Sequence, residues 1–288
     1  MKVPQFDAST TADLVRNLVI PPRPAMLDKL VALRGNPDMS LMDVADVIGS
    51  DLGLSAAILK AANSPFFGSG RTLTSILQAV NLLGERNIVQ LVHGLLLRLT
   101  LTSNSPPVIE QFWERTMHES AMAAALCEKL GRPSDECQTF ALFRGCGIAV
   151  MLMRYPNYER TLRLVTQARD RQISKIEQEF HGTSHDVVGY LVARTWNMPD
   201  NFCQAILLQH NPELFSDSDD ALLDHDHKMM VAVARAAQHV WRTSTDQNGD
   251  PGWKDRSEEL IAYLGMHEVE FEDWVDEMHD RIHAGVGL

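Results

Sequence analysis

Closely spaced helix starts and stops divide the first third of this 288-residue chain into short segments. Apolar residues recur at intervals of three and four within the segments, and no stretch alternates apolar and polar residues for long. Proline, glycine and asparagine separate the segments, for example at residues 35–37 and 63–65. Short helices of this kind bury their apolar faces only against one another, so the pattern predicts an all-α protein.

Local signals place several helix ends. Ser40, with Asp43 three residues later, predicts a capping box at the start of a helix. Thr74 or Ser75 is expected to begin a helix through Leu83, where Gly84 supplies a left-handed residue before a helix over 85–101. Further helices are expected at residues 10–19, 24–33, 54–62, 109–130, 135–153, 157–170, 173–180, 184–195, 199–209, 228–243, 255–264 and 268–283.

The composition is adequate for a large buried core, because 45% of the residues are apolar. The best internal boundary is the polar, proline-rich segment 103–107. We therefore predict an N-terminal helical half over residues 1–105, a second helical half over 106–214 and an acidic C-terminal helical extension over 215–288.

Negative charge is concentrated in the last quarter of the chain. The formal net charge is -12, and residues 215–288 carry 17 Asp and Glu but only 6 Lys and Arg. An acidic surface repels phosphate backbones, and no basic stripe with interleaved aromatic residues offsets it. Nonspecific nucleic-acid binding is therefore not expected.

The cysteines and the N-terminus indicate a cytoplasmic protein. Cys127, Cys137, Cys146 and Cys203 show neither C-x-x-C spacing nor the density of a disulfide scaffold. The first 11 residues lack an apolar core of signal-peptide length, and the longest apolar run, over residues 88–101, is too short to span a bilayer. We expect no membrane association.

A set of short motifs follows a distinctive order along the chain. The first half contains Pro21-Pro22-Arg23-Pro24, a glycine-containing segment over 48–54, Asn63-Ser64-Pro65-Phe66-Phe67-Gly68 and Leu82-Leu83-Gly84, and the second half contains Phe112-Trp113, Glu177, His185, Trp196 and His210. In order and spacing this combination resembles the HDOD domain, the HD-related output domain of bacterial signalling proteins. The resemblance covers roughly residues 18–214.

The resemblance implies an HD-like helical bundle with an N-terminal helical subdomain, to which this chain adds a C-terminal helical extension. It also implies that the second half, residues 106–214, is a degenerate HD-like half. The residues taken as the family signature are Asn63, Ser64, Phe67, Gly68, Gly84, Trp113 and Trp196. Read from the residues alone, those around Asn63 are architectural, because short polar groups and aromatics at a helix end usually serve capping and packing.

HDOD domains resemble HD phosphohydrolases that have lost their metal ligands. Residues 141–150 of this chain read ALFRGCGIAV, so Arg144-Gly145 stands where an HD enzyme has its central His-Asp pair. Arg115 or Thr116 stands where the first histidine would be. Arginine is not a cation ligand, so no metal, no cofactor and no catalytic residue is expected.

Four residues of the second half form a candidate polar pocket: Glu177, His181, His185 and His210. The first three recur at intervals of four, which would put them on one face of a continuous helix, although Gly182 interrupts it. The resemblance implies that Glu177, His185 and His210 are remnants or hydrogen-bonded structural groups. A metal site built from these histidines stays open as the less favoured interpretation.

Other His-Asp pairs are weaker candidates, because a metal site needs converging ligands and not adjacent ones. His225-Asp226 is expected in an acidic surface loop, and His279-Asp280 lies in the predicted last helix. That helix is amphipathic, with Phe271 and Trp274 on one face, and is expected to pack on the domain itself.

The sequence thus predicts a stand-alone HDOD-type regulatory protein in bacterial signal transduction. It would act without hydrolysis, by contact with an unidentified signalling protein or by binding a small ligand. The alternative is a divergent metal-dependent HD phosphohydrolase acting on nucleotides or cyclic dinucleotides. The sequence leaves the oligomeric state open.

Overall fold

The computed structural model describes residues 20, 22–34, 38–63, 72–101, 107–215, 223–245 and 249–284. Within these ranges the chain forms α-helices and one 3₁₀ turn, and no β-strand. The prediction of an all-α protein is therefore confirmed. The expected helix over 10–19 lies outside the described residues.

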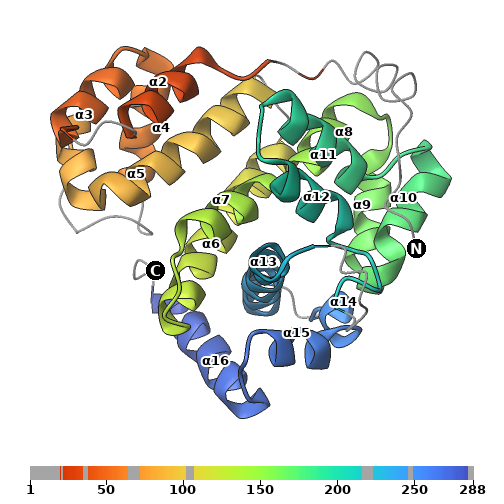
Figure 1. Cartoon of the computed structure of the whole chain (residues 1–288). Helices are drawn as coiled ribbons and strands as arrows, with labels where there is room; N and C mark the ends of the chain where they lie inside the picture. The colour runs from red at the N-terminus through yellow and green to blue at the C-terminus, as the bar shows by residue number, and fades with distance from the viewer. Residues whose placement is uncertain are drawn as a thin grey trace.

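Four helices make up the N-terminal part: α2 (Ala25–Arg34), α3 (Leu41–Gly49), α4 (Leu52–Ala62) and α5 (Ile76–Leu101). In Figure 1 the first three form a group beside the long α5, and both α3 and α4 pack on α5. The predicted capping box is confirmed, since the Ser40 side chain accepts from the Asp43 N–H and Asp43 accepts from the Ser40 N–H. The predicted left-handed Gly84 is also confirmed, with φ of 74°, and it kinks α5.

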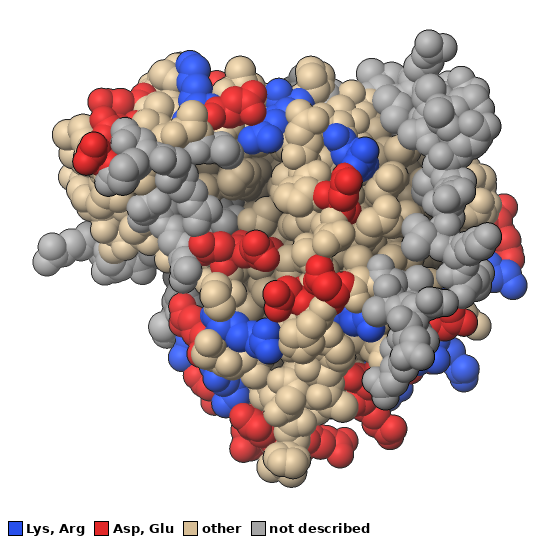
Figure 2. All heavy atoms as spheres, viewed as in Figure 1, with Lys and Arg blue, Asp and Glu red and all other residues tan. Residues whose placement is uncertain are grey.

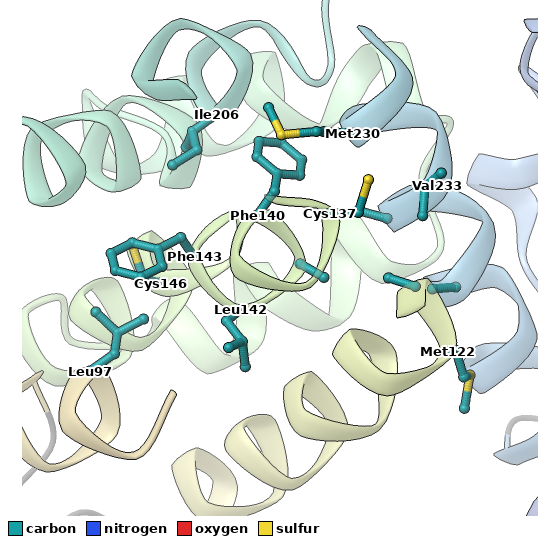
Figure 3. Packing of buried hydrophobic residues seen from close by; sticks show 14 of the residues in the cluster. Leu97, Met122, Cys137, Phe140, Leu142, Phe143, Cys146, Ile206, Met230 and Val233 are labelled. Carbon is teal, nitrogen blue, oxygen red and sulfur yellow. The ribbon is translucent and has the colours of Figure 1, made fainter. Parts of the chain in front are cut away.

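The second half carries α6 (Pro107–Lys129), α7 (Asp135–Phe143), α8 (Cys146–Arg154), α9 (Tyr158–Thr166), the 3₁₀ turn η1 (Asp170–Gln172), α10 (Ile173–His181), α11 (His185–Thr195) and α12 (Asp200–Leu208). The helix α7 is central, because it contacts α5, α6, α12 and α13. Figure 3 shows Phe140 next to Met230 and Phe143 next to Cys146. Apolar residues therefore surround α7 on several sides.

One predicted helix is two helices in the structure. The sequence predicts a helix over 135–153, but α7 ends at Phe143 and α8 begins at Cys146. The corner at Arg144-Gly145 lets α8 pack closely on α11, where a Cβ added to Gly147 would lie 1.9 Å from the carbonyl oxygen of His185. The predicted helix over 255–264 is confirmed, as one short helix over Ser257–Tyr263.

The C-terminal extension contains α13 (His225–Thr245), α14 (Pro251–Lys254), α15 (Ser257–Tyr263) and α16 (Glu268–Ala284). The expectation that His225-Asp226 lies in a loop is wrong, because Asp224 caps the helix that begins there by accepting the His227 N–H. Figure 1 shows α13 near the middle of the molecule, and it packs on α6, α7 and α12. The apolar face of α16 is buried at Phe271, Trp274 and Met278, which confirms that this helix packs on the protein itself.

A single apolar core includes buried side chains from all three predicted segments. The division at residues 105 and 214 stays a prediction. Among the described residues, every helix is too short or too polar to serve as a membrane span.

Candidate functional site

Two buried histidines, one at the start of a helix and the other just after the end of another helix, face each other in the second half. Gly182, with φ of 70°, ends α10 in a left-handed turn, and His185 is the first residue of α11. His210 follows the end of α12. The Nε2 atoms of the two imidazoles lie 3.3 Å apart, and both residues are buried.

A buried carboxylate holds the other nitrogen of each ring. Glu177 Oε2 lies 2.8 Å from His185 Nδ1 and accepts the backbone N–H of His185, while the Tyr158 hydroxyl donates to the other oxygen. Asp170 Oδ1 lies 3.1 Å from His210 Nδ1. These contacts fix the orientation of both rings, as carboxylates do for histidines in many binding sites.

The two carboxylates determine which ring nitrogens donate. A carboxylate accepts only, so each Nδ1 donates, and the two Nε2 lone pairs would then face each other. A proton on Nε2 of His185 would remove this repulsion. Burial by itself lowers the pKa of His185, but the Glu177 carboxylate outweighs it and raises that pKa above its usual value. The Glu177 carboxylate therefore favours the protonated form of His185.

His181 does not join the other three residues of the predicted pocket. The left-handed Gly182 ends α10 directly after it, so the spacing of four residues is not continued on one helix. Its Nε2 lies 2.8 Å from Thr161 Oγ1, and its ring contacts the edges of Tyr155 and Tyr158. The structure thus brings Glu177, His185 and His210 together without it.

Arg144 occupies the corner between α7 and α8, beside the histidine pair. Its Nε–H donates to Gln209 Oε1 at 2.9 Å, and the Gln209 amide donates back to the Arg144 carbonyl at 3.1 Å. Its Nη1 lies 3.9 Å from Glu119, and its Nη2 lies 3.5 Å from Gln238 Oε1. Burial lowers the pKa of Arg144 to about 10, so the guanidinium stays charged at neutral pH.

A cavity of about 60 Å³ lies in front of these groups. We call it the arginine pocket. Helices α6, α9, α11 and α13 and the corner between α7 and α8 form its walls. Its charged lining residues are Arg115, Glu119, Arg144, Asp170, Arg235 and Arg242, beside His185 and His210.

A buried ion-pair network forms one side of the arginine pocket. Arg235 on α13 donates two hydrogen bonds to Asp250, at 2.9 and 3.0 Å, and its Nε lies 3.4 Å from Asp170. Asp170 also accepts from Arg256 at 3.1 Å, and Asp250 lies 3.0 Å from Arg242. Burial would raise the pKa of both carboxylates, but the surrounding cations hold both far below their usual range.

The three arginine pocket residues that come from α13 were not predicted from the sequence. Arg235, Gln238 and Arg242 lie at intervals of three and four, so they share one face of the helix. This spacing is a weak signal by itself. Only the packing of α13 against α6 and α7 shows that this face is directed inward.

A hydrolytic metal does not fit the residues around the histidine pair. Two imidazoles at 3.3 Å could both bind one ion, but the described part of the chain contains no group of three or more His, Cys, Asp or Glu side chains placed to hold a metal. Arg144 and Arg235 add cationic charge beside the pair. A catalytic metal needs further ligands and an open coordination position, so this donor set is insufficient.

The described signature residues have structural roles. The Asn63 amide donates to the Leu73 carbonyl at 2.9 Å and accepts the Leu73 N–H at 2.7 Å, so it joins α4 to the segment before α5. Trp113 and Trp196 are buried, and Trp196 packs edge-on against Phe143. Ser64, Phe67 and Gly68 lie outside the described residues.

The remaining His-Asp pairs lie away from the arginine pocket lining. His225 contacts Tyr263, with 2.9 Å between Nδ1 and the hydroxyl oxygen. His279 on α16 lies 2.9 Å from the Thr243 hydroxyl on α13. These contacts join helices of the C-terminal extension.

Charge on the surface is distributed differently from charge in the arginine pocket. On the face drawn in Figure 2, acidic and basic side chains are interspersed and no continuous basic field is present. In the arginine pocket, four arginines and two histidines line one cavity. The cavity is therefore a local concentration of cationic side chains in an acidic protein.

Comparison with known proteins gives a family match and a distant relative. The family model described as HDOD domain matches residues 20–212. An uncharacterized protein from Treponema pallidum (strain Nichols) is 25% identical over 208 residues, which cover 71% of this chain and 40% of that protein. This chain therefore spans less than half of the length of that relative.

Several solved structures have the same fold. A protein from Marinobacter aquaeolei VT8, described as a signal transduction protein, has a TM-score of 0.72 at 20% identity, covering 99% of this chain and 66% of that one, just under two thirds of its length. An HDOD domain protein with unknown function from Geobacter sulfurreducens has a TM-score of 0.65 at 20% identity, covering 97% of both chains. A protein from Shewanella amazonensis SB2B, described as a phosphohydrolase, has a TM-score of 0.68 at 19% identity, covering 95% of this chain and 96% of that one. At these identities the likeness establishes the fold alone.

Proposed function

The chain belongs to the HDOD domain family, and from this premise we propose that it is a regulatory protein of signal transduction that binds a partner or a small ligand and does not hydrolyse phosphate esters. The observation that carries the proposal is the position of Arg144. Its guanidinium is buried beside His185 and His210, where an HD enzyme would need anionic or neutral metal ligands.

Electrostatics supports this assignment. A divalent ion at the histidine pair would face Arg144 and Arg235, and like charges in a buried site repel strongly. The carboxylates that could offset this charge are already engaged, since Glu177 holds His185 and Asp170 holds His210, Arg235 and Arg256. A site with this donor set lacks the free ligands that would hold a water-activating metal.

Metal analysis together with a hydrolysis assay tests the proposal. Protein purified without added metal is expected to contain far less than one equivalent of Fe, Mn, Zn or Mg, and to release no product from nucleotides or cyclic dinucleotides. One equivalent of transition metal that is lost in a His185→Ala His210→Ala double variant would contradict the proposal.

The second candidate function, a divergent metal-dependent phosphohydrolase, is favoured by one observation. The two Nε2 atoms face each other at 3.3 Å, and each ring is held by a carboxylate on its other nitrogen. Metal-binding histidines share this arrangement. Hydrolysis of nucleotides or cyclic dinucleotides that depends on added Mn²⁺ or Fe²⁺, and that disappears in His210→Ala, would support this second function.

A further inference from the structure

The charges facing the arginine pocket do not balance. Arg115, Arg144, Arg235 and Arg242 contribute four cations to its lining, and Glu119 and Asp170 contribute two anions. Asp250, behind the wall, pairs with two of the arginines, Arg235 and Arg242. Even when it is counted, four guanidiniums share three carboxylates, and Asp170 also pairs with Arg256. The Glu177 carboxylate is already paired with His185 and does not reduce this excess. Buried charge of one sign is costly unless an opposite charge compensates for it.

Arg144 is the cation with the poorest compensation. Its two hydrogen bonds within 3.5 Å go to the neutral side-chain amides of Gln209 and Gln238. Its closest carboxylate, Glu119, lies 3.9 Å away and also pairs with Arg115 at 3.3 Å. A guanidinium has five N–H donors, so Arg144 keeps donors available toward the cavity.

The other cations of the arginine pocket differ in how firmly they are held. Arg235 is locked by the two hydrogen bonds to Asp250. Arg242 is held by Asp250 and by the Thr166 carbonyl. Arg115 is the most exposed of the four, with 26% of its side chain accessible, and it lies over the Phe112 ring. Arg115 is therefore the arginine best placed to meet a ligand that enters from solvent.

From these observations we propose that the arginine pocket binds the phosphate group of a small phosphorylated ligand, with Arg144 as its main contact and Arg115 at the entrance. The proposal rests on the proposed function, because it names the ligand class of a non-hydrolytic protein. Planar guanidiniums bind phosphate oxygens through two parallel hydrogen bonds, which makes phosphate the matching anion. Glu119 and Asp170 limit the negative charge that the cavity accepts, so a single phosphate group is favoured over a polyphosphate.

The site is shared between the family domain and the extension. The family match ends at residue 212, whereas Arg235, Gln238 and Arg242 belong to α13. Phosphate binding would therefore stabilise the packing of α13 against α6 and the corner between α7 and α8. A ligand that bridges these elements can change how the extension is presented to other molecules.

Isothermal titration calorimetry of the full chain tests the proposal. The probes are inorganic phosphate, AMP and ATP, with sodium chloride at matched ionic strength as the control for screening. Saturable phosphate binding is expected, together with a melting temperature that rises with phosphate concentration. If AMP binds more tightly than phosphate, the natural ligand is an organic phosphate. If AMP binds no more tightly, the ligand is free phosphate. ATP is expected to bind more weakly than AMP.

Variants of single arginines locate the site. Arg144→Gln is expected to weaken phosphate binding by about tenfold or more, as for the loss of a charge-assisted hydrogen bond. Arg144→Lys keeps the charge but loses the planar guanidinium that can donate two parallel hydrogen bonds. An intermediate loss of phosphate affinity is therefore expected. Arg163→Gln is the matched control, because Arg163 lies on α9 with 72% of its side chain exposed and does not line the cavity.

Folding is checked for each variant by circular dichroism. If Arg144→Gln does not fold, Arg115→Gln at the entrance is expected to fold and to lose several-fold in affinity. The proposal is overturned if the wild-type protein binds no phosphate up to about 10 mM, a concentration that would half-saturate even a very weak site. It is also overturned if folded Arg144→Gln or Arg115→Gln binds as tightly as the wild type. Release of phosphate from AMP would instead overturn the proposed function and leave phosphate binding standing.

Discussion

The N-terminal helices and the rest of the molecule bury different kinds of side chain. In α2 to α5 the buried side chains that the structure describes are apolar, including Leu30, Ile48, Leu54 and Val92. Every described buried polar or charged side chain lies between Thr116 and Arg256. The first part is therefore held by apolar burial and local caps, and the second part also depends on paired charges.

This difference separates a scaffold from a candidate site. A buried ion pair is weak evidence for stability, because removing two charges from water costs about as much as their attraction returns. Apolar residues of similar volume could fill the same space. That the second part keeps a connected set of arginines and carboxylates around a cavity is explained more directly by ligand binding than by stability.

The largest effect is expected from Arg235→Met. This change removes the cation shared by Asp170 and Asp250, so two buried carboxylates lose compensation. The free energy of unfolding should fall by about 3–5 kcal/mol, as for other broken buried pairs. Urea unfolding measures the loss, and Arg163→Met provides the exposed control. A loss below about 1 kcal/mol would show that the network contributes little and would remove the contrast between the two parts.

A smaller loss is expected from Gly147→Ala in the second part. The new Cβ would meet the His185 carbonyl oxygen at 1.9 Å and the Gly189 nitrogen at 2.7 Å, so α8 and α11 must separate. Such overpacking costs about 1–3 kcal/mol or more. The matched control is Gly49→Ala at the end of α3, where no atom lies within 4 Å and alanine is expected to be neutral or to stabilise by up to about 1 kcal/mol. Equal effects at the two glycines would contradict the close packing of α8 and α11.

The smallest effect is expected from Ser40→Ala in the N-terminal part. The change removes the side chain that accepts the Asp43 N–H at 3.2 Å, and it leaves an unsatisfied donor at the start of α3. A loss of about 1 kcal/mol is expected in the same urea experiment. Ser40→Thr, which keeps a capping hydroxyl, should remain close to the wild type. If both variants unfold alike, local capping does not stabilise this part of the chain.

Local features of the fold were predictable from the sequence because their causes lie within a few residues. The capping box at Ser40 and the left-handed Gly84 depend on neighbours in sequence. The break at Arg144-Gly145 was not predicted, since arginine continues a helix readily and the corner follows from packing against α11. The start of α13 at His225 was missed because charged residues near a helix end look like a loop.

The candidate site was predicted in part. The family resemblance selected Glu177, His185 and His210, and these three residues meet in the structure. The resemblance gave no reason to single out Asp170 or Arg235, because the contacts that make them important join positions 40 and 65 residues apart. Pairing between residues so far apart in the sequence depends on how the helices pack. That packing cannot be read from a single sequence.

The sequence by itself determined the helical class and the HDOD family, and it predicted that Arg144-Gly145 stands in place of the central metal pair. These features depend on residue identity and spacing, which can be read directly from the sequence. Only the tertiary structure decided that Arg144 faces the histidine pair in one cavity, and that α13 closes this cavity with further arginines. The physical reason is that a pocket is formed by side chains from several helices, and its charge balance exists only after those helices have packed.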